Sequence, residues 1–135
     1  MKQDMTIKKM KLEDNSVFLK KFIKGIEGGR TLDVTDYTEE VIPCGYVIAS
    51  KTTKGVKTYF PLPTAKDAET GKTDYRALTS GEAYEGLLVS SILKEKPAAA
   101  IMTWGIVNSE VLPYAIPDEF KKALPHIDYQ KDEEA

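Results

Sequence analysis

Residues 84–112 read YEGLLVSSILKEKPAAAIMTWGIVNSEVL, and this stretch decides the fold class. Aliphatic and β-branched side chains form three strand-length segments within it, at 84–92, 98–104 and 105–112. Residues 94–97 (KEKP) are typical of a turn between the first two segments. The pattern predicts a buried meander of antiparallel strands.

The chain before this stretch has the same β character. Bursts of Val, Ile, Thr and aromatic residues occur at 31–37, 41–48 and 56–60. Pro43 and Gly45 interrupt the second burst, which favours a bend or an edge position there. Thr53, Lys54 and Gly55 are typical of a hairpin turn in which Gly55 supplies a positive φ.

Residues 64–81 (TAKDAETGKTDYRALTSG) are polar and contain two glycines, which predicts a long surface loop. Asp67, Glu69 and Asp74 offer carboxylates of the kind that calcium binds, but the spacing of an EF-hand loop and its final Glu are missing. A solvated polar loop is the expectation.

The segments near the two ends have different characters. Residues 1–15 alternate charged residues with Met and predict an arm that is flexible in isolation. Residues 16–27 have the three- and four-residue spacing of a short amphipathic helix, with a strand as the main alternative. A second short helix is expected from Pro117 to Leu124, with acidic residues first and lysines later, before Pro125 ends it. Residues 128–135 are mostly charged and predict a solvated tail.

Composition limits the fold and the partners. The chain has 135 residues, of which 41% are hydrophobic and 30% charged, so we expect a single β-rich domain over 16–127, of the mainly β class with short helices (α+β). The formal net charge of −2, without a Lys/Arg-rich face downstream of the N-terminus, argues against a nucleic-acid partner. Apolar stretches fall far short of the roughly 20 residues that span a bilayer, so a soluble protein without a membrane partner is expected.

Residues capable of catalysis are few. His126, the single histidine, has Asp128 as its nearest candidate partner, and Cys44 is the single cysteine. We expect both to pack structurally rather than to act as a general base or a nucleophile. One cysteine cannot form an internal disulfide, and without a secretory leader this predicts assembly in a reducing compartment. No zinc-site cluster, nucleophile elbow or phosphate-binding Gly-rich loop occurs, so no enzymatic activity and no metal or other cofactor are expected.

Two features of the central stretch bear on assembly. Trp104 is interpreted first as a core residue at the end of a strand and second as an interface anchor. The run from Ala98 to Ala100 allows another backbone or a bulky side chain to approach closely. That property suits a seam between subunits as well as a tightly packed barrel interior, and both interpretations stay open.

The order of features from 81 to 127 resembles the C-terminal part of the lambda-like bacteriophage head decoration proteins, a capsid-stabilising family. The resemblance lies in residues 86–89 (GLLV), in residues 105–107 (GIV) with Leu112 and Pro113 behind them, and in the helix segment 118–124 (DEFKKAL). Residues 42–48 (IPCGYVI) are similar to the entry strand of such proteins.

The resemblance implies a small antiparallel β-barrel that forms a homotrimer on the outer face of an icosahedral shell. It implies an auxiliary capsid protein in the virion, assembled in the cytoplasm of the bacterial host, with the major capsid protein as its partner. The arm would bind the capsid, and its contact residues would be Met5, Ile7, Met10 and Leu12. The trimer interface would involve Ala98, Ala100, Trp104 and Ile106.

Two alternatives to this function stay open. The first is a tail, baseplate or fibre adaptor that uses the same small barrel and presents residues 64–81 to its ligand. The second is a small enzyme or enzyme subunit that uses Cys44 or His126.

Overall fold

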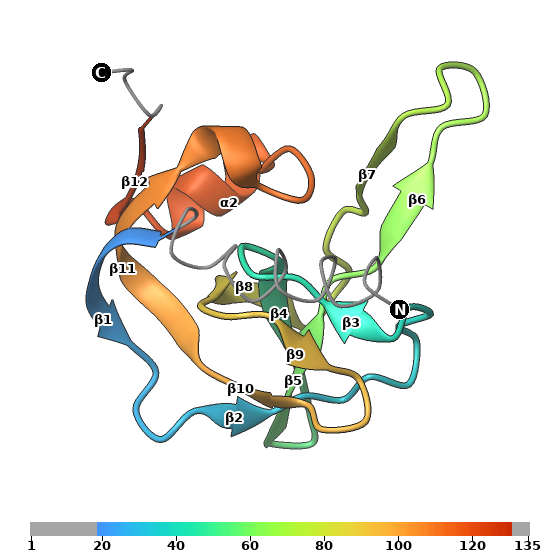
Figure 1. Cartoon of the computed structure of the whole chain (residues 1–135). Coiled ribbons are helices and arrows are strands. Elements are labelled where there is room, and N and C mark those ends of the chain that lie inside the picture. Colours follow the sequence, from blue (N-terminus) through green and yellow to red (C-terminus); the bar gives the residue numbers. More distant parts are fainter. Residues whose placement is uncertain (1–18, 131–135) are drawn as a thin grey trace, which may run out of the picture.

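The computed structural model describes residues 19–130. These residues form a mainly β structure with one short α-helix, α2 (Asp118–Ala123), and one 3-10 turn, η1 (Ser109–Val111) (Figure 1). The strands are β1 (Leu19–Gly25), β2 (Arg30–Thr31), β3 (Val41–Ile42), β4 (Val47–Thr53), β5 (Val56–Pro61), β6 (Thr64–Lys66), β7 (Thr73–Tyr75), β8 (Glu82–Leu88), β9 (Ile92–Leu93), β10 (Ala98–Ala99), β11 (Ile101–Asn108) and β12 (Ile127–Gln130).

The main sheet has six strands in the order β1-β11-β8-β4-β5, with β12 paired to β11. All its pairs are antiparallel except β11 with β12, which run parallel. Three two-stranded sheets, β10-β2, β3-β9 and β6-β7, surround it. The sheet is not closed, since β1 and β5 stand at its two ends without pairing to each other, so the expected barrel is not confirmed.

The β4–β5 hairpin turns where the sequence predicts. Lys54 and Gly55 have φ of 52° and 80°, and positive φ at both central residues is the requirement of the tight turn that matches strand twist. The bend predicted at Pro43 and Gly45 is also confirmed, because the Tyr46 N–H donates to the Pro43 carbonyl and Gly45 has φ of 84°.

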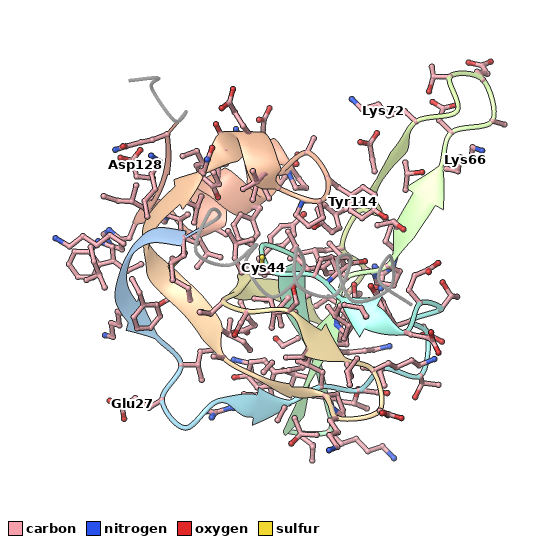
Figure 2. The ribbon with its side chains drawn as sticks, in the orientation of Figure 1. Glu27, Cys44, Lys66, Lys72, Tyr114 and Asp128 are labelled. Carbon is pink, nitrogen blue, oxygen red and sulfur yellow. The ribbon has the colours of Figure 1, made fainter. Side chains whose placement is uncertain are left out.

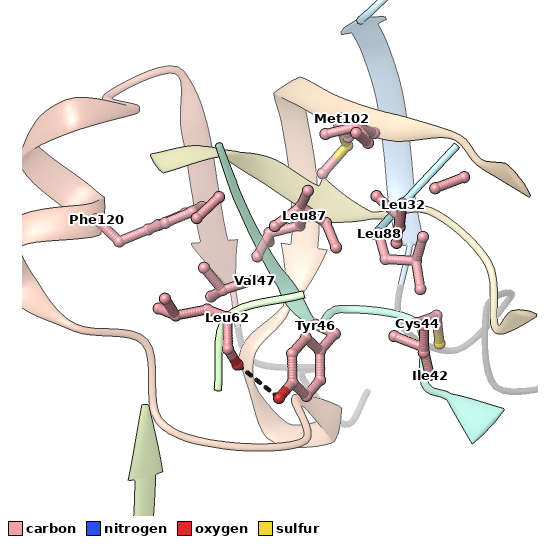
Figure 3. Packing of buried hydrophobic residues seen from close by; sticks show 14 of the residues in the cluster. Leu32, Ile42, Cys44, Tyr46, Val47, Leu62, Leu87, Leu88, Met102 and Phe120 are labelled. Atoms are coloured by element: carbon pink, nitrogen blue, oxygen red, sulfur yellow. Dashed lines mark hydrogen bonds between the residues drawn. The ribbon is translucent and has the colours of Figure 1, made fainter. Parts of the chain in front are cut away.

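The core lies between the main sheet and the elements packed on it. Val47, Ile48, Leu87, Leu88 and Met102 are fully buried on neighbouring strands (Figure 3). The helix α2 is confirmed, and it contributes one buried side chain, Phe120, whose ring meets Tyr84 edge-on at 5.3 Å. Its acidic residues occupy the first turn and its lysines the last, the arrangement that the helix dipole favours.

The helix expected over 16–27 is wrong for residues 19–25, which form β1. Its partner is β11, with Phe22 opposite Gly105 and Lys24 opposite Trp104. Pairing with β11 supplies the hydrogen bonds that a short amphipathic helix would have had to supply within itself. The alternative of a strand is therefore confirmed there, whereas residues 1–15 lie outside the described residues.

The predicted antiparallel meander is confirmed in part. Its first two segments pair antiparallel as β8 and β11, with Ile101 opposite Leu88. The third segment is wrong, because residues 101–108 form one continuous strand. The strands of this region also pair with partners elsewhere in the chain: β8 with β4, β9 with β3, β10 with β2 and β11 with β1. Gly105 lies within β11 instead of opening a strand. A Cβ there would lie 2.5 Å from both the Lys21 carbonyl oxygen and the Met102 sulfur, so glycine permits the close approach of β1.

Two segments expected to be irregular contain strands. Residues 64–81 hold the β6–β7 hairpin, which extends away from the rest of the molecule in Figure 1. Residues 128–130 of the predicted tail form part of β12, which pairs with β11 in the parallel direction. Asp128 and Gln130 are exposed, as predicted, and only the strand itself was not expected.

Candidate functional site

Three strands at one corner of the main sheet present an exposed surface that we call the Trp104 face. In strand register, Lys24 of β1 lies opposite Trp104 of β11, and Lys21 lies opposite Ile106. On the other side of β11, Ile106 lies opposite Asp128 of β12. The Trp104 face consists of the outward side chains of Lys21, Lys24, Trp104, Ile106, His126 and Asp128.

Strand alternation explains why these side chains point outward. Val107 is fully buried and Ile127 is 4% exposed, and these two residues lie on the inner side of β11 and β12. Successive side chains of a strand point to opposite sides, so Ile106 and Asp128 must face solvent. Burial of Val107 and Ile127 thus dictates the exposure of their neighbours.

Trp104 is the largest apolar group on this face. Its side chain is 43% exposed, and its indole lies over the His126 imidazole with ring centroids 5.2 Å apart and planes inclined at 36°. The core-packing interpretation of Trp104 is wrong. Phe22 and Ile23 of the adjoining β1 are 49% and 42% exposed. Phe22 lies opposite Gly105, so it faces the other side of the sheet from Trp104.

The outer side of β1 borders this face. Among residues 19–130, β1 pairs with β11 alone and is the end strand of the main sheet. Three lysines, Lys20, Lys21 and Lys24, occur along the strand, and charged side chains on an edge oppose indiscriminate strand pairing. The lysines therefore favour pairing with a specific partner over nonspecific aggregation.

The structure brings together part of the predicted trimer interface. Trp104 and Ile106 share the Trp104 face, with Ile106 half-buried. Ala98 and Ala100 are exposed on the strand segment that leads into β11, with buried Ala99 between them. The predicted arm residues Met5, Ile7, Met10 and Leu12 lie outside the described residues.

Sequence reasoning missed His126 as a member of the Trp104 face and missed the exposure of Phe22. His126 joins it because β12 runs beside β11, and nothing in the local sequence indicates a parallel pairing between segments so far apart. Phe22 was assigned to a helix face, and only the strand conformation of 19–25 exposes it. The period of the lysines does not distinguish the two conformations in so short a segment.

The two residues named for catalysis do not form a catalytic arrangement. His126 is exposed on the Trp104 face, and the Asp128 carboxylate accepts a hydrogen bond from the Gln130 amide at 2.7 Å instead of holding the imidazole. Cys44 is buried in the core near Ile42 (Figure 3), and its backbone N–H donates to the Ser91 hydroxyl at 3.0 Å. Packing of Cys44 is confirmed.

One buried hydroxyl does contact a carboxylate. The Ser50 Oγ donates to the Glu85 Oε2 at 2.7 Å, and the Lys57 Nζ lies 2.9 Å from the same oxygen. Ser50 is 2% exposed, so a substrate cannot reach it. The three side chains instead link the neighbouring strands β5, β4 and β8. Within residues 19–130, no group of three or more His, Cys, Asp and Glu side chains is placed to bind a metal ion.

Comparisons with models of protein families, with curated proteins and with solved structures find no significant match. None of the helices formed by residues 19–130 is long and apolar enough to cross a membrane.

Proposed function

We propose that this protein is a structural virion component, a head decoration protein that binds the outer surface of the capsid as a homotrimer. The observation that carries the proposal is the exposure of Trp104 on β11 beside β1, which is the end strand of the main sheet among residues 19–130. A large aromatic group and an available strand edge are the two features by which a small β domain attaches to other chains.

The Trp104 face supports the trimer. Tryptophan supplies much of the binding free energy at interfaces when neighbouring subunits remove it from water. Ala98 and Ala100 are exposed and small, so a neighbouring backbone can approach the strand that leads to Trp104. The small β-barrel of the decoration family belongs to the same proposal, with β1 and β5 as the strands that would have to meet for the sheet to close.

The segment before β1 supports capsid binding. Residues 1–15 lead into β1, and Met5, Ile7, Met10 and Leu12 are the apolar residues that we assign to the capsid contact. Adding such a segment as a strand to a sheet of the major capsid protein would form backbone hydrogen bonds. Three arms on one trimer would bind with an avidity well above that of one arm, because the second and third bind at high effective concentration.

The test combines mass measurement with capsid binding. Light scattering of the purified protein is expected to give the mass of a trimer, and the protein is expected to co-sediment with shells assembled from the major capsid protein of the same virus. A variant without residues 1–15 is expected to stay folded and trimeric while losing the shells. A monomer that stays in the supernatant would overturn the proposal. Unfolding of the variant that lacks residues 1–15 would contradict the role assigned to the arm.

The β6–β7 hairpin favours one second function, that of a tail, baseplate or fibre adaptor. It extends from the body, with Lys66 at the end of β6 and Lys72 just before β7 (Figure 2), so it could reach a ligand that the main sheet does not touch. Sedimentation with tail components but not with shells would support the adaptor and exclude decoration.

A further inference from the structure

Three tyrosines from separate parts of the chain form a small pocket, which we call the tyrosine pocket. The Tyr46 ring is buried, and the rings of Tyr37 and Tyr114 stand nearly perpendicular to it, at 88° and 82°, with centroids 5.7 and 6.1 Å away. Tyr114 lies beside the start of β6 (Figure 2). The three rings therefore pack edge to face and together line the pocket.

Two of the three phenol hydroxyls are held by the backbone. The Tyr46 hydroxyl donates to the Leu62 carbonyl at 2.7 Å, as drawn in Figure 3, and the Tyr37 hydroxyl donates to the Val41 carbonyl at 2.6 Å. The Tyr114 hydroxyl has no hydrogen-bond partner among residues 19–130. The first two bonds hold their rings in place, and the third hydroxyl is available to a ligand.

Tyr37 and Tyr46 stay neutral near neutral pH. Burial, followed by the nearby Tyr114 and Glu39, raises the pKa of Tyr37 to about 12, and burial also raises the pKa of Tyr46. The negative charge of the pocket therefore comes from carboxylates and from the electron-rich ring faces.

Asp36 and Glu39 supply those carboxylates at the exposed rim. Neither forms an ion pair with another described residue, and no Lys or Arg lines this pocket. Arg76 lies in the adjoining cleft and close enough to Asp36 for their charges to interact, but its guanidinium already makes two bonds to Glu82, at 2.8 and 3.0 Å. The tyrosine pocket keeps its acidic rim.

We infer that the tyrosine pocket binds an ammonium group, either the head of a lysine side chain from a partner or a free small amine. Cations are attracted to aromatic faces, and carboxylates at the rim add charge attraction. The volume is about 130 Å³, below the ~300–1,000 Å³ of pockets that hold drug-sized ligands. A head group of a few heavy atoms fits this volume.

The inference is tested on the free protein, so its outcome is independent of capsid binding. Choline, n-butylammonium and N-acetyl-lysine methylamide are titrated at constant ionic strength, with tyrosine ring NMR signals as the readout. The neutral control is 3,3-dimethylbutan-1-ol, in which carbon replaces the nitrogen of choline. We expect at least one cation to bind about fivefold to thirtyfold more tightly than the alcohol. Tighter binding of choline would indicate a free quaternary amine as the source, and tighter binding of the lysine analogue a side chain.

Variants assign the binding to this pocket. Glu39→Gln and Asp36→Asn are each expected to weaken cation binding about threefold or more, and Tyr114→Leu to weaken it more strongly because a ring face is lost. Asp67→Asn on the β6–β7 hairpin removes the same charge away from the tyrosine pocket and is expected to leave binding unchanged. Equal binding of the cations and the alcohol, or no shift of the Tyr37 and Tyr114 signals up to about 50 mM ligand, would overturn the inference.

Discussion

The indole of Trp104 lies over the imidazole of His126, with ring centroids 5.2 Å apart, because β12 runs parallel beside β11. The contact holds one face of the tryptophan while 43% of its side chain stays exposed. A large aromatic group that is held in place and still accessible loses little conformational freedom on binding, which favours its use as an anchor.

Replacing Trp104 is expected to affect oligomer formation much more than the unfolding free energy of the domain. If the protein forms the proposed trimer, Trp104→Ala is expected to dissociate it or to weaken it at least tenfold, because the side chain's exposed part is what a neighbouring subunit would bury. The unfolding free energy of the isolated domain should fall by no more than about 1–2 kcal/mol, since nearly half of the side chain is in water. Light scattering and urea denaturation measure the two effects.

Val56→Ala is the matched control for this prediction. Val56 is 66% exposed at the β4–β5 turn, away from the Trp104 face, so its truncation should change neither the mass nor the stability noticeably. An oligomer mass that Trp104→Ala leaves unchanged would count against the interface.

Neighbouring residues of β12 are expected to respond oppositely to truncation. Ile127→Ala should lower the unfolding free energy by about 2–4 kcal/mol, because a side chain that is 4% exposed leaves a cavity. Asp128→Ala, on the exposed side of the same strand, should stay within about 0.5 kcal/mol. Equal effects in urea denaturation would mean that β12 does not pack as described.

A methyl group at Gly86 is expected to be severely destabilising. Its Cβ would meet the Met102 carbonyl oxygen and lie 2.7 Å from the Ile101 Cγ2, where β8 crosses close to β11. Gly86→Ala should therefore lower the unfolding free energy by about 3 kcal/mol or prevent folding.

Gly71→Ala provides the comparison for this substitution. Gly71 has φ of 74° in the β6–β7 turn, with nothing near its missing Cβ, so its replacement should cost only about 1 kcal/mol of backbone strain. Thermal unfolding curves of the two variants would contradict the steric argument if Gly86→Ala were the milder change.

Glu82 is expected to give the protein an acid-sensitive contribution to stability. Its carboxylate accepts two bonds from Arg76 and one from the Thr79 N–H at 2.9 Å, and these lower its pKa from about 4.5 to about 2. The ionised form is the one stabilised in the folded state. The contribution is therefore present above about pH 4.5 and is lost as the pH falls through about 2.

Glu82→Gln should flatten the dependence of the unfolding free energy on pH between these limits. We expect a loss of about 1–2 kcal/mol at neutral pH, modest because Arg76 is 31% exposed and the pair is partly screened. Glu69→Gln on the exposed hairpin removes the same charge and should keep the wild-type slope. A wild-type slope in Glu82→Gln would contradict the assignment.

Local signals in the sequence were sufficient where the chain interacts with itself over a few residues. The positive φ at Lys54 and Gly55, the bend at Gly45 and the helix at 118–123 each follow from turn residues or from charge order along one turn. The β character of 41–61 follows from its residue types. Interactions at such short range can be predicted from the local amino-acid sequence.

Signals failed where the partner of a segment is distant. Residues 19–25 carry lysine and apolar residues that suit either a helix or a strand, and pairing with β11 decides between them. Gly105 looked like the start of a strand, whereas it lies inside one because β1 passes too close for a Cβ. The tyrosine pocket draws on residues from three distant segments, so no local motif could indicate it.

By itself the sequence determined the mainly β character, the β4–β5 hairpin turn, the helix at 118–123 and the burial of Cys44, because these depend on residue type and on neighbours along the chain. Only the tertiary structure decided that β12 pairs in parallel with β11, that Trp104 faces solvent and that Tyr37, Tyr46 and Tyr114 meet. The physical reason is that strands pair through backbone groups, which are the same for almost every residue type. The partner of a strand, and the side of the sheet on which each residue lies, are therefore fixed only when the strands pair.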